Sequence, residues 1–344
     1  MAKGKKIKVA ITIGDLNGVG LEVILKTLSD SRVYEHCIPL IYGSEQIVRS
    51  YAKLCGLEGV HFVVRESADK ADPTKINVIN CINTSVEINP GTPSRETGKL
   101  AFESLKNAVE DLASNKADVL VTAPIDKKSI QSEDFSFPGH TEYLAGYANE
   151  DTPLMILVSE DMRVALATGH LPLREVADSI SAELIVSKAS VLIRSLKQDF
   201  GVVKPKVAVL ALNPHAGDNG LLGEEETKII EPAIEQLQDE NHLVFGPYGA
   251  DGFFGSGLYH KFDGVLAMYH DQGLAPFKAL SFNFGVNFTA GLPIVRTSPD
   301  HGTAYDIAGK GMANEQSFRS ALFMACDIYR QRQLQRQLEA NALG

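Results

Sequence analysis

The chain has 344 residues, of which 44% are hydrophobic and 22% are charged, an ordinary composition for a globular protein with room for two domains. The formal net charge of −10 argues against nucleic acid as a partner, because phosphate binding needs a basic surface. No run of about 18 apolar residues occurs, so no membrane span is expected. The basic N-terminus leads into a short strand and not into the apolar core of a signal peptide.

Four widely spaced cysteines form no Cys-x-x-Cys pair: Cys37, Cys55, Cys81 and Cys326. Cysteines of this kind are expected to be buried free thiols in a reducing compartment. A cytoplasmic enzyme or binding protein is therefore the expectation.

Apolar, β-branched runs alternate along the chain with segments of helical periodicity, a pattern typical of an α/β sheet. Strands are predicted at 7–13, 38–43, 60–64, 76–81, 117–124, 153–159, 162–170, at 206–215 and at 263–270. Helices are predicted at 21–28, 44–55, 100–114, from 139 onward, at 181–199, 223–238 and 314–340. Residues 246–257 are glycine-rich and are interpreted as a connector.

The segment GDLNGVG, residues 14–20, follows the first predicted strand and precedes a helix. Backbone N–H groups at such a junction can bind an anion. The segment lacks the full G-x-G-x-x-G spacing, however, and the alternative is a tight turn capped by Asp15 or Asn17.

His140 and Thr141 stand where a polar loop opens into a helix. There they could offer a ring nitrogen and a hydroxyl to a ligand. The alternative is that Thr141 is an ordinary helix N-cap.

Three of the nine histidines end apolar runs: His170 in ALATGH, His215 in VLALNPH and His270 in VLAMYH. A single histidine there is usually a hydrogen-bonded structural residue. Three in equivalent places could bind a divalent metal and leave positions open, where a substrate hydroxyl would be polarised. Asp271 or Asp251 could orient a ligand, although Asp271 could also cap a turn.

Lys278, Asn287 and Arg296 follow His270, and each flanks an apolar stretch. A lone surface lysine or arginine is usually only solvated. Together, these three side chains would suit a phosphate or a carboxylate.

Residues 301–311, HGTAYDIAGKG, are rich in glycines that permit close backbone approach. His301 could stack on a base, and Asp306 could accept from a ribose or cap the next turn. The segment resembles the adenosine-binding loop of the β-decarboxylating dehydrogenases, the isopropylmalate and isocitrate dehydrogenase group. The resemblance implies cofactor contacts from His301, Gly302, Thr303 and Asp306. Without it, a glycine-rich turn before a helix explains the spacing equally well.

Several long motifs occur in one order between residue 7 and about residue 320: GHTE, HLPLRE, LNPHAGDNG, AMYHDQGL, FK, GVN, GLPIVRTS and DHGTA. Together they resemble the 4-hydroxythreonine-4-phosphate dehydrogenase family of the vitamin B6 pathway. The resemblance implies one divalent metal, zinc, magnesium or cobalt, on His170, His215 and His270, with Asp271 beside it. Implied substrate contacts are His140, Thr141, Lys278, Asn287 and Arg296.

The same resemblance implies a homodimer with its metal site at the subunit interface. It also implies a two-domain α/β/α fold of the isopropylmalate dehydrogenase type, with the active site in the cleft between domains. We expect residues 1–125 plus 276–344 to bind the nucleotide, and residues 126–275 to carry the metal, the substrate and the dimer contacts. The implied reaction oxidises 4-phosphooxy-L-threonine at C3 with NAD or NADP, and the product decarboxylates to 3-amino-2-oxopropyl phosphate.

Two departures from the family pattern leave the substrate open: Pro138 precedes GHTE where threonine is frequent, and Leu21 follows GVG where proline is usual. D-threonate or D-erythronate 4-phosphate is the alternative substrate, and related members act on cyclic dihydrodiols. A non-enzymatic two-lobed binding protein would leave residues 301–311 without a purpose. No arginine cluster for a 2′-phosphate follows that loop, which favours NAD.

Overall fold

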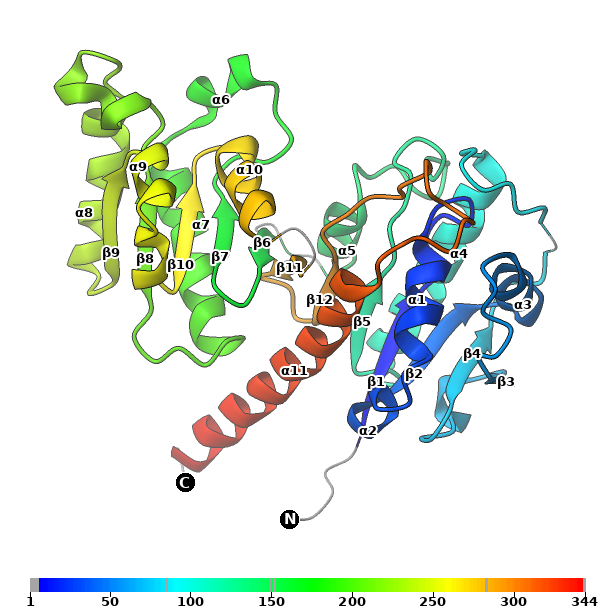
Figure 1. Ribbon diagram of the computed structural model, residues 1–344. Coiled ribbons are helices and arrows are strands. Elements are labelled where there is room, and N and C mark those ends of the chain that lie inside the picture. The colour runs from blue at the N-terminus through cyan, green and yellow to red at the C-terminus, as the bar shows by residue number, and fades with distance from the viewer. Residues whose placement is uncertain (1–5, 85, 149, 151–152, 282–283, 343–344) are drawn as a thin grey trace. The chain divides into compact units, whose positions relative to one another are not determined.

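The computed structural model describes residues 6–84, 86–148, 150, 153–281 and 284–342. The chain folds into two compact units, one formed by Met1–Tyr147 with Pro293–Arg330 and one by Ala148–Leu292 with Gln331–Gly344. Each unit combines a β-sheet with helices (Figure 1). The predicted α/β class with two parts is therefore confirmed.

Within its described residues, the first unit has six parallel strands in the order β3-β4-β2-β1-β5-β12. Their bounds are β1 (Ile7–Thr12), β2 (Cys37–Gly43), β3 (Phe62–Arg65), β4 (Ile76–Asn80), β5 (Val119–Thr122) and β12 (Arg296–Pro299). β2 and β5 are buried along their whole length, because strands covered on both faces are apolar throughout.

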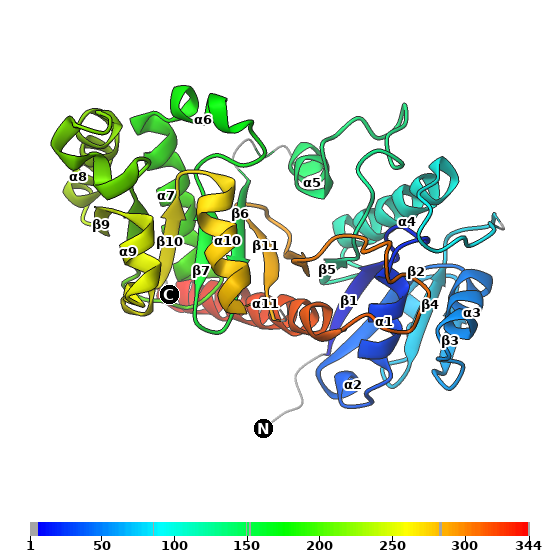
Figure 2. The same ribbon diagram turned by 45° about the horizontal axis from the view of Figure 1, so that its top comes forward.

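The helices of this unit are α1 (Gly20–Leu28), α2 (Val33–His36), α3 (Glu45–Leu54), η1 (Ala68–Lys70), α4 (Arg95–Ala113) and α5 (His140–Ala148). α1 and α4 cover opposite faces of the sheet (Figure 2). The chain leaves β1 toward β2 and later returns to β5 on the other side of β1, so right-handed crossovers put the helices on opposite faces. The carboxyl ends of β1 and β5 therefore form a topological switch point, where α/β folds bind ligands.

The sheet of the second unit has the order β11-β6-β7-β10-β8-β9 in its described residues. β6 is antiparallel to β7 and β11, whereas β7, β10, β8 and β9 run parallel. The strands are β6 (Leu154–Val158), β7 (Arg163–Leu166), β8 (Lys206–Leu210), β9 (Leu243–Tyr248), β10 (Gly264–Ala267) and β11 (Val286–Ala290). The parallel arrangement brings the carboxyl ends of β7, β10 and β8 to one edge.

The remaining helices are α6 (Leu173–Ser179), α7 (Ala182–Gln198), η2 (Pro214–Gly220), η3 (Glu226–Ile230), α8 (Glu231–Asp239), α9 (Ala250–Gly255), η4 (Leu258–Lys261), α10 (His270–Ser281) and α11 (Gln316–Ala342). α7 and α10 cover opposite faces of β10 and its neighbours (Figure 1). α11 is shared between the units, which divide it at Arg330 and Gln331.

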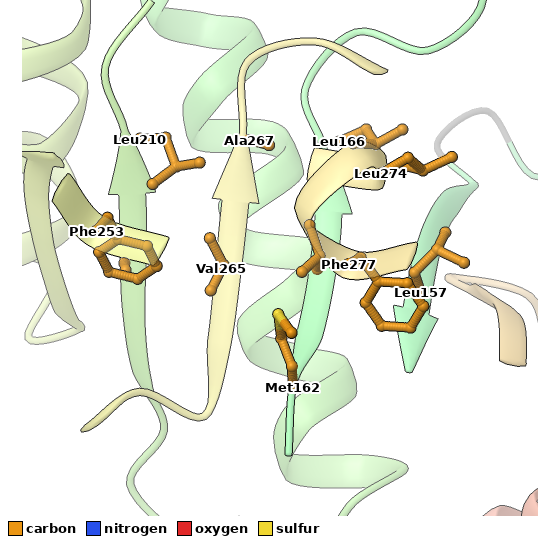
Figure 3. Packing of buried hydrophobic residues seen from close by; sticks show 11 residues of the cluster. Leu157, Met162, Leu166, Leu210, Phe253, Val265, Ala267, Leu274 and Phe277 are labelled. Atoms are coloured by element: carbon orange, nitrogen blue, oxygen red, sulfur yellow. The ribbon is translucent and has the colours of Figure 1, made fainter. Parts of the chain in front are cut away.

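A buried apolar cluster fixes α9 and α10 against the second sheet (Figure 3). Phe253 of α9 and Phe277 of α10 are 2% and 0% exposed, and they pack against strand residues such as Val265. α10 comes closest at Gly273, where a Cβ would lie 2.9 Å from side-chain atoms of both Leu166 and Val164. Glycine is needed here because the sheet lies directly beneath the helix.

One buried ion pair fastens the last part of α11 to the second unit. Arg332 Nε donates to Asp199 Oδ1 at 2.6 Å, and Arg332 Nη1 donates to the Leu292 carbonyl at 3.1 Å. Ser195 Oγ donates to the other carboxylate oxygen of Asp199 at 2.7 Å. Both charged side chains are almost fully buried, 6% and 2% exposed.

The units are bounded differently from the predicted domains, which divided the chain at 125/126 and 275/276. Residues 276–292 belong to the second unit because β11 pairs with β6. Residues 126–147 belong to the first. The interpretation of 246–257 as a connector is wrong, since this segment contains the end of β9 and all of α9. In the described residues, no helix is long and apolar enough to cross a bilayer.

The cysteines only partly match the expectation of buried free thiols. All four are free, but Cys37 and Cys326 are buried while Cys55 and Cys81 are partly exposed. Desolvation raises the pKa of Cys55 and of Cys81 to about 12. The two partly exposed thiols are therefore expected to stay protonated and unreactive at neutral pH.

Candidate active site

Two of the three predicted metal-binding histidines follow strands that are tied together beyond their ends. Thr168 donates from its backbone N–H and its Oγ1 to the Met268 carbonyl at 3.1 and 2.7 Å. His170 comes two residues after Thr168, and His270 two residues after Met268. Their ring centroids lie 5.4 Å apart, so the structure brings these two predicted ligands together.

A buried glutamine links the β10 end to the β8 end. Met268 N–H donates to Gln272 Oε1 at 2.7 Å, and Gln272 Nε2 donates to the Ala211 carbonyl at 2.6 Å. Gln272 is 9% exposed. The amide therefore joins the strand that leads to His270 to the strand that leads to His215.

His215 lies in η2, where the backbone is left-handed over five successive residues. The φ angles are 53° for His215, 52° for Ala216, 75° for Gly217, 44° for Asp218 and 56° for Asn219. This conformation costs roughly 1–2 kcal/mol for a residue that carries a Cβ. Such a turn persists only when surrounding contacts determine it, and strain of this kind gathers at functional sites.

The predicted acidic neighbours differ in their contacts. Asp271 Oδ1 lies 2.7 Å from His270 Nδ1, although the Asp271 side chain is 85% exposed. Asp251 lies on α9, which begins beside the turn, since a Cβ on Gly249 would be 4.0 Å from His215 Cα. Across the described residues, no three His, Cys, Asp or Glu side chains are grouped closely enough to hold a metal ion.

Three predicted ligands of anions lie on different elements. Lys278 is half-buried on α10. Asn287 pairs with Leu157 across β11 and β6, and its Oδ1 is buried without a hydrogen-bond partner in the part of the chain that is described. Both residues belong to the second unit, with the three histidines, whereas Arg296 belongs to the first.

Arg296 is a buried cation at the start of β12, with 3% exposure. Its Nε and Nη2 donate to Thr122 Oγ1 at 3.1 and 2.7 Å. Burial lowers the pKa of Arg296 to about 10, and the nearby Glu142 carboxylate acts in the opposite direction. The guanidinium therefore stays charged at neutral pH in a place where a bound anion would be strongly stabilised.

His140 is the other buried polar group of this region. Desolvation, followed by the charges of Arg296 and Lys127, lowers the pKa of His140 well below its usual value. Its Nε2 is buried without a hydrogen-bond partner among the described residues, and an unpaired buried nitrogen is a place where a ligand would be accommodated. α5 begins at His140, so Thr141 lies inside its first turn and the N-cap interpretation of Thr141 is wrong.

The predicted cofactor loop, residues 301–311, packs tightly on residues 14–20. Val19 N–H donates to the Thr303 carbonyl at 2.9 Å, and the Tyr305 hydroxyl donates to Asp15 Oδ2 at 3.0 Å. A Cβ on Gly18 would lie 2.8 Å from the Thr303 carbonyl oxygen. The loop is therefore held at the switch point between β1 and β5.

Within this loop, His301 presents one free ring nitrogen. Its Nδ1 lies 2.9 Å from the Gly302 carbonyl, so Nδ1 carries the proton, and its buried Nε2 has no partner in the described chain. Gly302 and Asp306 are exposed, and Thr303 is half-buried. An acceptor nitrogen beside exposed polar groups could contact a nucleotide, as the sequence predicts.

The contacts of residues 14–20 favour a capped turn over an anion site, because the segment holds its own buried carboxylate. Asp15 is 1% exposed. It accepts from Asn17 N–H at 2.8 Å and from Ser129 Oγ at 3.2 Å, in addition to the Tyr305 hydroxyl. A second anion would be repelled here, and Asp15 caps the turn as the alternative interpretation expects.

Residues 35–325 match the protein family described as "Pyridoxal phosphate biosynthetic protein PdxA". The chain belongs to this family. A PdxA-type relative from Bacteroides thetaiotaomicron, named 4-hydroxythreonine-4-phosphate dehydrogenase, is 52% identical over 339 residues, which cover 98% of this chain and 93% of that protein. A protein of Oceanobacillus iheyensis, provisionally named D-threonate 4-phosphate dehydrogenase, is 40% identical over 329 residues, or 94% and 98% of the two chains.

Solved structures share the fold. The crystal structure of 4-hydroxythreonine-4-phosphate dehydrogenase from Klebsiella pneumoniae matches with a TM-score of 0.83 and 33% identity, covering 96% of this chain and 99% of that one. A terephthalate dihydrodiol dehydrogenase from Burkholderia xenovorans LB400, with a TM-score of 0.62 and 22% identity over 94% and 98% of the chains, shares the fold alone. The PdxA relatives are dehydrogenases, and the family assignment makes this protein an oxidoreductase.

Two residues that tie together the strand ends leading to the histidines were not predicted from the sequence. Thr168 and Gln272 lie inside the motifs ATGH and HDQG, in which only the histidines and Asp271 were assigned a role. A threonine or glutamine directly after a predicted buried strand could have indicated them, because a polar group buried there needs a hydrogen-bond partner.

Proposed function

We propose that this PdxA protein oxidises 4-phosphooxy-L-threonine at C3 with NAD or NADP, giving 2-amino-3-oxo-4-phosphooxybutanoate, which decarboxylates to 3-amino-2-oxopropyl phosphate. The observation that carries the proposal is that three histidines follow the carboxyl ends of adjacent parallel strands. The chain is also 52% identical to a protein named 4-hydroxythreonine-4-phosphate dehydrogenase. D-threonate or D-erythronate 4-phosphate is the second candidate substrate, favoured by the named relative from Oceanobacillus iheyensis.

The chemical types of these donors suit a divalent metal, and a second copy of the chain could supply the remaining ligand that the described residues of one copy do not group together. Neutral imidazoles suit zinc or cobalt, and His170 and His270 already lie with their rings 5.4 Å apart. We assign His170, His215 and His270 as the ligands, with Asp271 beside His270. A bound cation would polarise the substrate hydroxyl and ease its deprotonation.

The substrate's anionic ends require cations and N–H donors. Arg296 is buried and charged, and it offers a planar donor set that suits a phosphate or carboxylate. His140 stays neutral beside it, so its free Nε2 can accept from a substrate hydroxyl or ammonium group. We propose that Thr141, Lys278 and Asn287 complete the contacts.

For the cofactor we propose residues 301–311, with contacts from His301, Gly302, Thr303 and Asp306. The support is the packing of this loop over the switch point and the unpaired Nε2 of His301. The absence of an arginine cluster after the loop favours NAD over NADP.

A homodimer is proposed because apolar side chains are exposed next to two of the histidines. Leu171 and Leu173 are 42% and 72% exposed beside His170, and Leu221 and Leu222 are 77% and 44% exposed beside the His215 turn. Leucines exposed in a group beside polar site residues are typical of an interface. A second copy bound here would bring its own histidines close to this edge.

The deciding experiment measures NADH or NADPH formation with 4-phosphooxy-L-threonine, D-threonate 4-phosphate and D-erythronate 4-phosphate, each with and without a chelator. The proposal expects the fastest reduction with the threonine derivative and its loss on chelation. Faster turnover of a threonate or erythronate substrate would select the second candidate. Binding of all three without any cofactor reduction would overturn both.

Mixing tests the shared site. His215→Ala and His270→Ala proteins should each be inactive, and subunit exchange should give about half heterodimer. If the two residues of one site come from different subunits, one site in each heterodimer is intact, and activity recovers to roughly a quarter of wild type. No recovery despite demonstrated exchange would show that one subunit supplies both histidines.

A further inference from the structure

The left-handed turn that carries His215 is held by one buried carboxylate. Glu226 is 1% exposed. Its Oε1 accepts from the backbone N–H groups of Leu212 and Asn213 at 2.9 and 2.7 Å, and its Oε2 accepts from Asn213 Nδ2 at 3.0 Å. These contacts fix the residues that lead into the turn, just before His215.

The same carboxylate also packs against the middle of the turn. A Cβ on Gly217 would lie 2.6 Å from Glu226 Oε2 and 3.0 Å from the Gly223 carbonyl oxygen. The turn closes over this point, where Leu222 N–H donates to the Gly217 carbonyl at 3.0 Å. Glu226 therefore contacts the turn at its entry and at its centre, and the glycine leaves the space that the carboxylate occupies.

Glu226 itself is placed by an uncommon element. It is the first residue of η3, a π-helix over Glu226–Ile230 that leads directly into α8. π-helical turns are rare and occur often at functional sites. Here the element directs the Glu226 side chain toward the residues before His215, while Ile230 at its other end is fully buried.

We propose that Glu226 is a positioning residue for His215, an inference that rests on the proposed metal site. It touches neither substrate nor metal ligand side chain, and acts by holding Leu212, Asn213 and Gly217 so that the His215 imidazole projects at the edge shared with His170 and His270. A carboxylate suits this role because its neighbours are N–H donors. The amide of glutamine would keep one acceptor and turn an N–H toward the remaining donor.

The test compares Glu226→Ala and Glu226→Gln with a matched control, Glu231→Gln, an exposed acid five positions further on. Amide hydrogen exchange of residues 212–223 reports the turn, and cobalt(II) titration of the metal-free full-length protein reports the ligand set. We expect Glu226→Ala to exchange at least about tenfold faster in this segment while α10 is unchanged. Cobalt(II) affinity should fall roughly 10- to 100-fold, the usual effect of removing a group that orients a ligand. Glu226→Gln should lie between wild type and alanine in both readouts.

Wild-type exchange and wild-type cobalt(II) affinity in the Glu226→Gln and Glu226→Ala proteins would overturn the inference. So would faster exchange in the turn with unchanged cobalt(II) affinity, because the turn would then not position the ligand. If Glu226→Ala fails to fold, the glutamine variant decides between the same outcomes. A wild-type protein that binds no cobalt(II) would instead refute the proposed metal site, and that result is separate from the exchange data.

Discussion

Replacing Gln272 with leucine should weaken the edge that carries the histidines. Leucine nearly matches the volume of glutamine but can neither accept from Met268 N–H nor donate to the Ala211 carbonyl, the bonds seen at 2.7 and 2.6 Å. Each buried backbone group left unpaired costs about 1–3 kcal/mol. The sum for the two groups is roughly 2–6 kcal/mol, a large share of a domain's total stability.

The assay is native-state hydrogen exchange, since a protein of two units need not unfold in one step. Opening free energies for amides of β8 and β10 should fall by that amount in Gln272→Leu, while those of β1 and β2 should not change. Gln236→Leu is the control. It removes an exposed glutamine of α8 and should alter stability by less than about 0.5 kcal/mol.

Two outcomes would refute this reasoning. If β8 and β10 open with unchanged free energy in Gln272→Leu, the amide does not bridge the two strand ends. If all strands of both units lose stability equally, the glutamine supports global folding and not this edge. Metal affinity should be measured in the same variant. It should decrease together with the opening free energies of β8 and β10, because Gln272 links the segments that carry His215 and His270.

Arg332→Met should destabilise the second unit by about 3–5 kcal/mol, because it leaves the buried Asp199 carboxylate without its cation. In urea denaturation, the double variant Arg332→Met, Asp199→Leu should regain part of this stability. No gain in stability over Arg332→Met would contradict the pairing. Gly273→Ala should cost about 1–3 kcal/mol through overpacking against the sheet, seen as a lower melting temperature, and an unchanged melting temperature would mean that α10 can shift freely. The pKa of His140 is lower in the folded than in the unfolded protein, so the unfolded chain takes up the proton first. The free energy of unfolding should therefore fall as the pH drops below the unfolded pKa of about 6.5. His140→Gln should remove this contribution to the pH dependence, which urea titrations above and below about pH 6.5 would measure. Cys55, whose pKa is raised to about 12, should react with iodoacetamide at pH 8 far more slowly in the native than in the unfolded protein, and equal rates would contradict the burial of its thiol.

Period and composition were sufficient to predict the α/β class and nine of the twelve strands of the described residues, because buried strands are continuous apolar runs whatever their partners. β9, β11 and β12 were not predicted. The placement of the three histidines after strand ends at one sheet edge could be predicted on the same ground, and the structure brings His170 and His270 together. The pairing order β7-β10-β8, which places the strands before these histidines side by side, depends on contacts between distant segments and leaves no local pattern.

The errors have a common physical cause. Residues 246–257 contain five glycines, which normally indicate a loop, yet Phe253 is buried in the core and the packing stabilises α9 against its weak helix propensity. Asp15 could have been a cap or the edge of an anion site, and its set of donors is completed by Ser129 and Tyr305, which are both far away in sequence. Contacts between distant segments determine the conformation of such residues, and these contacts cannot be inferred from a single sequence.

The shared helix α11 and the late strand β12 have a consequence for synthesis on the ribosome. β1 to β5 emerge first, but the sheet of the first unit lacks β12 until residue 299 has been made. Until then, Thr122 also lacks its buried hydrogen-bond partner Arg296. Between those events the whole second sheet, from β6 to β11, is translated and can pair. The sheet begun first is thus completed last. A nascent chain must keep the open edge of β5 from other strands for more than 150 residues of elongation, from Thr122 to Arg296 (296 − 122 = 174).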